Sequence, residues 1–353
     1  MYRLAAIWAA LAVPLWSAIA WFWPASAAWP EAAGSIDWHA RAMVSGYVGA
    51  VVVSFLVAPL RRWPEDRSAL GWALLLAWLA ARVLSLWSPA TVGYGIAADL
   101  IFFGIAAIVL GRRALRAPAP NNLLFAAAPW VLMLSVAAPM QVLEMVAILI
   151  AVLAGRVIPG LVNTRAPGRR AQIRPDLERI ALGALVAAIG LRALMPGSAV
   201  ADLAAAFAAL ANLYRWWSWA PLAGFRADLR LATMLFAYAW LPVWLLVDAA
   251  GDWAPVGAGS HALAAGLVGG MTWAMMNRTL AEPLGPARWL EKLGAAALGV
   301  GVLARFSLAF TPAAAYLPLA AVATLGWSLA FASLALRGLG AGAAAVPVAG
   351  RRQ

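Results

Sequence analysis

The chain has 353 residues, of which 65% are hydrophobic and only 11% are charged, and its mean hydropathy is +0.84. The apolar runs are long and continuous rather than alternating, which excludes a soluble domain and a β-barrel and predicts an all-α polytopic membrane protein. The net charge of +12 comes almost entirely from arginines between apolar runs, so it indicates orientation in a lipid bilayer rather than nucleic-acid binding.

About twelve transmembrane helices are predicted, joined by short connections. They lie near 3–23, 38–60, 69–87, 92–111, 121–136, 140–159, 176–195, 198–214, 229–249, 260–281, 289–309 and 313–336. We expect residues 1–337 to form a single transmembrane domain and residues 338–353 to form a flexible tail. Residues 1–28 are similar to a signal peptide, but the run to Trp23 is long enough to span, so an uncleaved first helix is expected.

The predicted loops alternate in charge. Loops 24–37, 88–91, 137–139, 196–197, 250–259 and 310–312 contain no lysine or arginine. The intervening loops carry arginines at positions 61, 62, 67, 112, 113, 116, 165, 169, 170, 174, 215, 226, 278 and 288. The positive-inside rule therefore places both termini in the cytoplasm.

A weak internal repeat runs through the spans. Arg82, Arg192 and Arg305 each lie near the outer end of a span, about 110 residues apart, and the two histidines are separated by twice that distance. This spacing suggests three blocks of four helices, with His39 on span two and His261 on span ten. Chance in a chain rich in alanine, leucine and arginine is the alternative.

His39 and His261 are the only histidines, and each opens an outward-starting helix behind a candidate cap, Asp37 or Ser260. The positive end of a helix dipole disfavours imidazolium, and neutral imidazole is the form that binds a metal. If spans two and ten adjoin, the two rings would face each other across a haem iron. The alternative is a pair of unrelated interfacial residues with hydrogen-bond partners.

Met43 lies one turn below His39, where its sulfur could serve as an axial or soft copper ligand, although filling a gap in the helix packing is the simpler interpretation. Four arginines lie at the depth of the histidines and could pair with the two haem propionates: Arg41, Arg82, Arg192 and Arg305. The alternatives for them are reaching to the interface or pairing with acidic residues such as Asp99, Glu144 or Asp202.

Asp99 and Glu144 are the acidic residues most clearly within spans. An intramembrane carboxylate suggests a functional site such as a proton path, but neutralising the buried arginines is the interpretation we favour. The chain has no nucleotide-binding loop and no catalytic triad pattern, so hydrolytic chemistry has no support. The absence of cysteine excludes disulfides, thiolate metal sites and covalently attached haem.

Four stretches in register resemble motifs of the NnrS family, bacterial inner-membrane proteins that contain haem and copper and act in the nitric oxide response. They are W-H-A-R-A-M, G-Y and S-F-L-V-A within 38–58; G-R-V-I-P and an asparagine within 155–163; Y-R-W and Y-A-W-L-P within 214–242; and H-A-L, two glycines, M-T and M-N-R within 261–278. The resemblance covers most of the chain. It implies a haem b protein of nitrosative stress, with His39 and His261 as ligands.

Several family positions differ here. Arg41 and Ala42 stand where the family has a histidine and a glutamate, and Leu235 and its neighbours replace another histidine. The sequence A-E-P-L at 281–284 replaces the family's G-H-T-G. A copper site that draws on the missing residues is disfavoured, whereas a haem with two imidazole ligands is retained.

Twelve spans with histidines on spans two and ten are also similar to the catalytic subunit of haem-copper oxidases, as a fold-level analogy. Two other functions are open at this point. One is a cofactor-free transporter or channel in which Asp99, Glu144 and the buried arginines line a path. The other is an assembly partner of a respiratory complex, and a redox partner is also expected if the chain carries haem.

Overall fold

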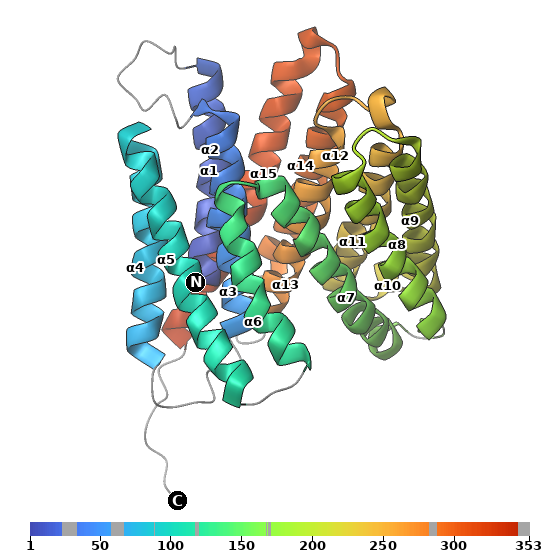
Figure 1. Cartoon of the computed structure of the whole chain (residues 1–353), viewed down its shortest axis with the longest axis horizontal. Helices are drawn as coiled ribbons and strands as arrows, with labels where there is room; N and C mark the ends of the chain where they lie inside the picture. Colours follow the sequence, from blue (N-terminus) through green and yellow to red (C-terminus); the bar gives the residue numbers. More distant parts are fainter. Residues whose placement is uncertain are drawn as a thin grey trace, which may run out of the picture.

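The computed structural model describes residues 1–22, 34–57, 67–87, 89–116, 120–166, 168, 171–281 and 288–344, and these contain helices and short connections but no strand. The helices form one bundle in which successive long helices run in opposite directions (Figure 1). Apolar helices satisfy all their backbone polar groups internally, which is why this composition folds this way in lipid. The predicted fold class is confirmed.

Each predicted span coincides with a helix or with a continuous run of helical segments. The bounds are α1 Tyr2–Phe22; α2 Ile36–Arg41, η2 Ala42–Val48 and α3 Gly49–Val57; α4 Arg67–Trp87; α5 Pro89–Arg116; α6 Pro120–Met133 and η4 Leu134–Val136; α7 Pro139–Arg165; α8 Pro175–Leu194; α9 Ala199–Ser218; α10 Pro221–Ala227; α11 Leu229–Ala249; η5 Gly251–Trp253; α12 Ala258–His261, η6 Ala262–Gly269 and α13 Gly270–Ala281; α14 Arg288–Ser307 and η7 Leu308–Phe310; and α15 Ala313–Ala344.

Eight of these segments, within the described residues, are long and apolar enough by themselves to cross a membrane: 2–22, 36–57, 69–86, 93–116, 139–165, 229–249, 288–310 and 313–337. By length and hydropathy alone, the predicted number of about twelve transmembrane helices is therefore approximate. Helices α8 and α9 fall short although each has 20 residues. Both carry charged side chains that pair inside the bundle, which lowers their hydropathy without making them surface helices.

The bundle has two ends that differ in the residues they carry. The histidine end is where α1, α4, α8 and α14 finish and where α2 and α12 begin, and it lies at the top of Figure 1. The arginine end is the opposite one, where α5 and α7 finish with Arg113, Arg116 and Arg165 in their last turns. The two histidines thus lie at one common end, as the loop pattern predicts.

Helix contacts occur both within and between the predicted blocks of four, since α9 also packs on α11 and α1 packs on α15. The hairpins α4–α5, α8–α9 and α14–α15 are the most closely packed pairs, and in each hairpin the first helix carries one of the three repeated arginines. In the first block α1 packs on η2, and in the last block α11 packs on η6 and α13. The middle block differs, because α6 and α7 make few contacts and lean apart towards the arginine end (Figure 1).

Small residues set the closest approaches between helices. A Cβ added to Gly301 of α14 would lie 2.7 Å from the backbone nitrogen of Trp327, and one added to Gly326 of α15 would lie 2.7 Å from the Cα of Gly301. Close backbone approach of this kind is how membrane helices gain packing contacts without a hydrophobic driving force.

Helix α15 continues to Ala344, so the first part of the predicted tail is helical. Residues 345–353, the end of the stretch similar to a signal peptide (23–28) and the loop arginines Arg61 and Arg62 lie outside the described residues.

Candidate functional site

A π-helical segment follows closely after each of the two histidines. His39 lies in α2, and the π-helix η2 starts three residues later and runs for 7 residues. His261 is the last residue of α12, and the π-helix η6 follows it for 8 residues. Such segments are rare, are usually a single turn, and occur mainly at functional sites. Two of them at equivalent places mark the histidine end as the first place to look for a site.

The ring of His261 is held in one orientation by its own helix start. Its Nδ1 lies 2.8 Å from the carbonyl oxygen of Gly257, and the hydroxyl of Ser260 lies 3.2 Å from the same nitrogen. A carbonyl oxygen only accepts, so Nδ1 carries the hydrogen, and in the neutral ring Nε2 keeps a free lone pair. Gly257 has φ 82°, a left-handed conformation that favours glycine and turns its carbonyl into this position.

The ring of His39 is oriented by stacking instead. Its centroid lies 4.4 Å from that of the Trp16 ring, at an interplanar angle of 34°. The Trp16 indole is fixed because its Nε1 donates to the carbonyls of Gly34 and Ser35, both at 3.1 Å. Nδ1 of His39 is buried and has no hydrogen-bond partner within the described residues. A buried nitrogen of this kind is costly to leave unpaired, so the ring is suited to a ligand.

The predicted caps of these helices are wrong. Ser35 caps α2 and accepts from the backbone nitrogen of Trp38 at 3.1 Å, while Asp37 lies inside the first turn. Gly257 caps α12, and Ser260 lies within that helix, where its hydroxyl donates to the carbonyl of Gly257. Both helices begin earlier than the sequence pattern indicates, because the loop turns before them supply the caps.

The two imidazoles and Arg305 form one group at the histidine end. The positive charge of Arg305 acts on both rings, and His39 also acts on His261. Arg305 is half-buried near the end of α14, and it has no acidic partner in the described part of the chain. The structure thus brings together two rings that are 222 positions apart in sequence, with one cation beside them.

Arg82 is held in a buried ion pair with Asp99 that links α4 to α5. Both residues are buried, at 3% and 5% exposure. The guanidinium rests against Gly46 of η2, where no other residue would leave room for it. The charge of Arg41, which is half-buried on α2, also acts on Asp99. Arg82 and Asp99 therefore neutralise each other, as the alternative interpretation expected.

Arg192 bridges two carboxylates, those of Glu144 on α7 and Asp248 on α11, and its guanidinium lies 5.5 Å from the centre of the Trp244 ring. Asp248 lies against Gly259 of α12, two residues before His261. Arg192 therefore links α7, α8 and α11, and it holds Asp248 in place against the helix that carries His261. Of the four arginines predicted for propionates, Arg41 and Arg305 are the two without an ion pair in the described residues.

Met43 is partly buried and packs with Trp8 and Trp38 in the small apolar cluster around the start of α2. This contact agrees with the gap-filling interpretation. No group of three histidine, aspartate or glutamate side chains that could hold a metal ion occurs in the described ranges. In haem the porphyrin ring supplies the other nitrogen ligands of the iron, so the protein needs to supply no more than two imidazoles.

Sequence reasoning overlooked the most completely hydrogen-bonded charge in the bundle, Arg215 at the end of α9. It donates to both carboxylate oxygens of Glu178, at 2.8 and 2.5 Å, and to the hydroxyl of Tyr238 at 2.7 Å. Gly155 of α7 leaves the space for its guanidinium. The signal was present, because Gly155, Arg215 and Tyr238 all belong to the motif stretches described above. Their role is to join α7, α8, α9 and α11.

The family model for the NnrS protein matches residues 1–340, nearly the whole chain. The match includes both histidine helices, the three repeated arginines and all four motif stretches. No curated protein matches this sequence.

Proposed function

Because the chain belongs to the NnrS family, we propose that it is a haem b protein of the bacterial inner membrane that acts in the response to nitric oxide. In this proposal His39 and His261 are the residues that would hold the haem. One observation carries it: two imidazoles, each close before a π-helical segment on its helix, lie at the same end of the bundle. Copper is not part of the proposal, because several residues that the family's copper site would use are replaced in this sequence, with Arg41 and Ala42 among the replacements.

The donor chemistry of the two rings supports the assignment. The hydrogen bond from Nδ1 of His261 to the Gly257 carbonyl fixes the tautomer and presents Nε2, which is the arrangement that metal-binding imidazoles commonly have. His39 offers a ring stacked on Trp16, and its buried Nδ1 has no hydrogen-bond partner among the described residues. Bound haem would supply an iron able to exchange one electron or to bind a diatomic molecule.

Arg305 and Arg41 are the residues that would pair with the propionates. A guanidinium matches a carboxylate with two parallel hydrogen bonds, and a cation in the membrane without an acidic partner is costly. Arg305 meets this description best, because its charge already acts on both rings. In this proposal the histidine end faces the periplasm and both termini face the cytoplasm, as the positive-inside rule indicates from the loop arginines.

The decisive experiment is pigment analysis of detergent-purified protein from haem-replete cells. We expect a Soret band and one haem b per chain, with the band lost in His261→Ala and strongly reduced in His39→Ala. Met43→Leu, which changes a neighbouring side chain of similar size, is the matched control and should keep the full band. Colourless wild-type protein would contradict the proposal.

The nitric oxide role needs a separate measurement. Addition of nitric oxide to the reduced protein should shift the Soret band, and the shift should be absent in the colourless histidine variants. Stable co-purification of colourless protein with a respiratory complex would instead favour an assembly partner. Substrate transport by the colourless protein, abolished by Asp99→Asn, would favour a transporter.

A further inference from the structure

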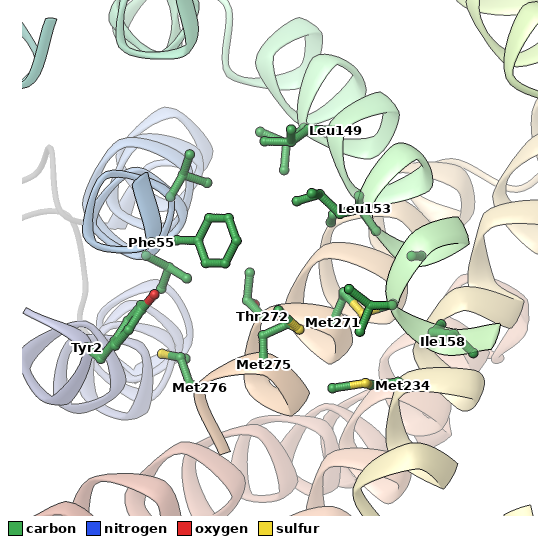
Figure 2. A pocket seen from close by; sticks show the side chains of 16 residues that line it. Tyr2, Phe55, Leu149, Leu153, Ile158, Met234, Met271, Thr272, Met275 and Met276 are labelled. Atoms are coloured by element: carbon green, nitrogen blue, oxygen red, sulfur yellow. The ribbon is translucent and has the colours of Figure 1, made fainter. Parts of the chain in front are cut away.

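A second site lies in the half of the bundle towards the arginine end, away from the histidines. A cleft there has about 710 Å³ of empty space, open side included. Its walls come from α3 and α7, and its floor comes from α11 and α13 (Figure 2). No residue of α6 lines it, because α6 and α7 lean apart. The cleft is therefore reached from the side of the bundle that lipid would cover.

The lining is almost wholly apolar. Phe55 points across the cleft from α3 towards Leu149 and Leu153 of α7 (Figure 2). Four methionines form the floor: Met234, Met271, Met275 and Met276. Methionine side chains are flexible and polarisable and adapt to the shape of an apolar guest. Two hydroxyl side chains line it, those of Tyr2 of α1 and of Thr272, and Thr272 already interacts with Tyr47 at 2.5 Å. The cleft therefore suits a hydrocarbon chain rather than a polar molecule.

The G-R-V-I-P motif of α7, which the haem site does not use, forms one edge of this cleft. Val157 and Ile158 line it, while Gly155 faces Arg215 on the other side of the helix. Arg156 is exposed and lies next to these lining residues on the face that also exposes Met145 and Gly160. Arg156 has no ion pair or hydrogen bond within the described residues. A single motif thus places an apolar wall and a free cation side by side.

We propose that this cleft binds an anionic phospholipid of the cytoplasmic leaflet, with one acyl chain between α3 and α7 and its phosphate on Arg156. An apolar slot alone would accept any chain, and a free cation at its edge adds the preference for a negative headgroup. The guanidinium can reach the interface on its long side chain while its stem covers apolar surface. The lipid fills the place that α6 would occupy if the middle block packed like the other two.

The proposal is tested with purified, delipidated protein titrated with dioleoylphosphatidylglycerol or dioleoylphosphatidylcholine and examined by native mass spectrometry. We expect one phosphatidylglycerol to be retained more tightly than any phosphatidylcholine. Arg156→Gln should weaken its retention about fivefold, which corresponds to the roughly 1 kcal/mol that one basic residue contributes to anionic lipid binding. Arg112→Gln removes an exposed arginine near the end of α5 and should change nothing.

The apolar half of the site is tested independently. Val157→Phe projects a ring into the cleft and should lower retention of phosphatidylglycerol, whereas Met145→Phe on the exposed face of α7 should not. The proposal would be overturned if the protein retained phosphatidylglycerol and phosphatidylcholine equally and Arg156→Gln did not change the retention of either lipid. A neutral isoprenoid retained in place of phospholipid would overturn it as well. The haem spectrum of the same samples is recorded in parallel. Absence of a Soret band would contradict the proposed haem function but would not affect the measurement of lipid retention.

Discussion

The two histidine helices contain the same π-helical device but are held in the bundle by different means. On the His39 side, indole nitrogens donate to carbonyls of η2: Trp8 to Ala42 and Trp78 to Gly46, both at 2.8 Å. On the His261 side, aromatic rings pack into the space that glycines of η6 leave by having no side chain. Trp240 packs against Gly266, and Trp327 packs against Gly269.

A π-helical turn disturbs the regular hydrogen bonding of the backbone, and a carbonyl left unpaired in lipid is costly. The His39 helix meets this cost with tryptophan donors and a buried arginine behind Gly46. The His261 helix meets it by close packing, and the hydroxyl of Thr272 donates to the carbonyls of Val268 and Gly269. A π-helical segment can thus be stabilised either by side-chain hydrogen bonds and a buried ion pair or by close packing at glycines. The two helices should therefore be sensitive to different substitutions.

The largest effect is expected from breaking the buried ion pair behind η2. Asp99→Asn leaves the guanidinium of Arg82 buried without a counter-charge, and we expect a loss of about 3–5 kcal/mol in the free energy of unfolding. Unfolding in mixed micelles measures it. Asp176→Asn removes one partner of an exposed pair with Arg179 and should cost less than about 0.5 kcal/mol. Similar losses for both variants would show that the His39 side does not depend on its buried charge.

An intermediate effect is expected from filling the space at a glycine on the other side. A Cβ at Gly269 would lie 2.5 Å from the Trp327 ring, so Gly269→Ala should cost about 1–3 kcal/mol through overpacking. Gly183 of α8 has nothing near its added Cβ, and Gly183→Ala should be neutral or slightly stabilising. Thermal melting of the two variants in detergent compares them. If Gly269→Ala left the thermal stability unchanged, close packing of Trp327 against Gly269 would not stabilise η6.

The smallest effect is expected where the two helices meet. The hydroxyl of Tyr47 in η2 interacts with that of Thr272 in α13 at 2.5 Å. Tyr47→Phe should cost only about 0.5–1.5 kcal/mol, because Thr272 keeps its bonds to two backbone carbonyls. Combining it with Thr272→Val in a double-mutant cycle isolates the bond between the helices, and strictly additive losses would show that it contributes nothing.

The spans and the common end of the two histidines could be predicted because they depend on local chemistry. A run of about twenty apolar residues must be helical in lipid, and arginines are retained on one side. The resemblance to the NnrS family, confirmed by the match over residues 1–340, rested on motif order and spacing, which are also visible in the chain itself.

Partners within the bundle could not be predicted in the same way. Arg82, Arg192 and Arg305 each lie on the first helix of a closely packed hairpin, yet only the first two have acidic partners in the described structure. Asp248, a partner of Arg192, lies at a helix end that sequence reasoning treated as an ordinary boundary. Which carboxylate reaches which guanidinium depends on helix rotation and crossing, and these are decided by packing.

The sequence by itself determined a polytopic helical protein, its family and the helix ends at which the two histidines lie, since each follows from hydropathy, charge or motif spacing read along the chain. Only the tertiary structure decided the π-helical segments, the orientation of the His261 ring, the isolation of Arg305 and the cleft beside α7. The physical reason is that these four features are set by contacts between residues far apart in sequence, whose free energy depends on distance and direction in space.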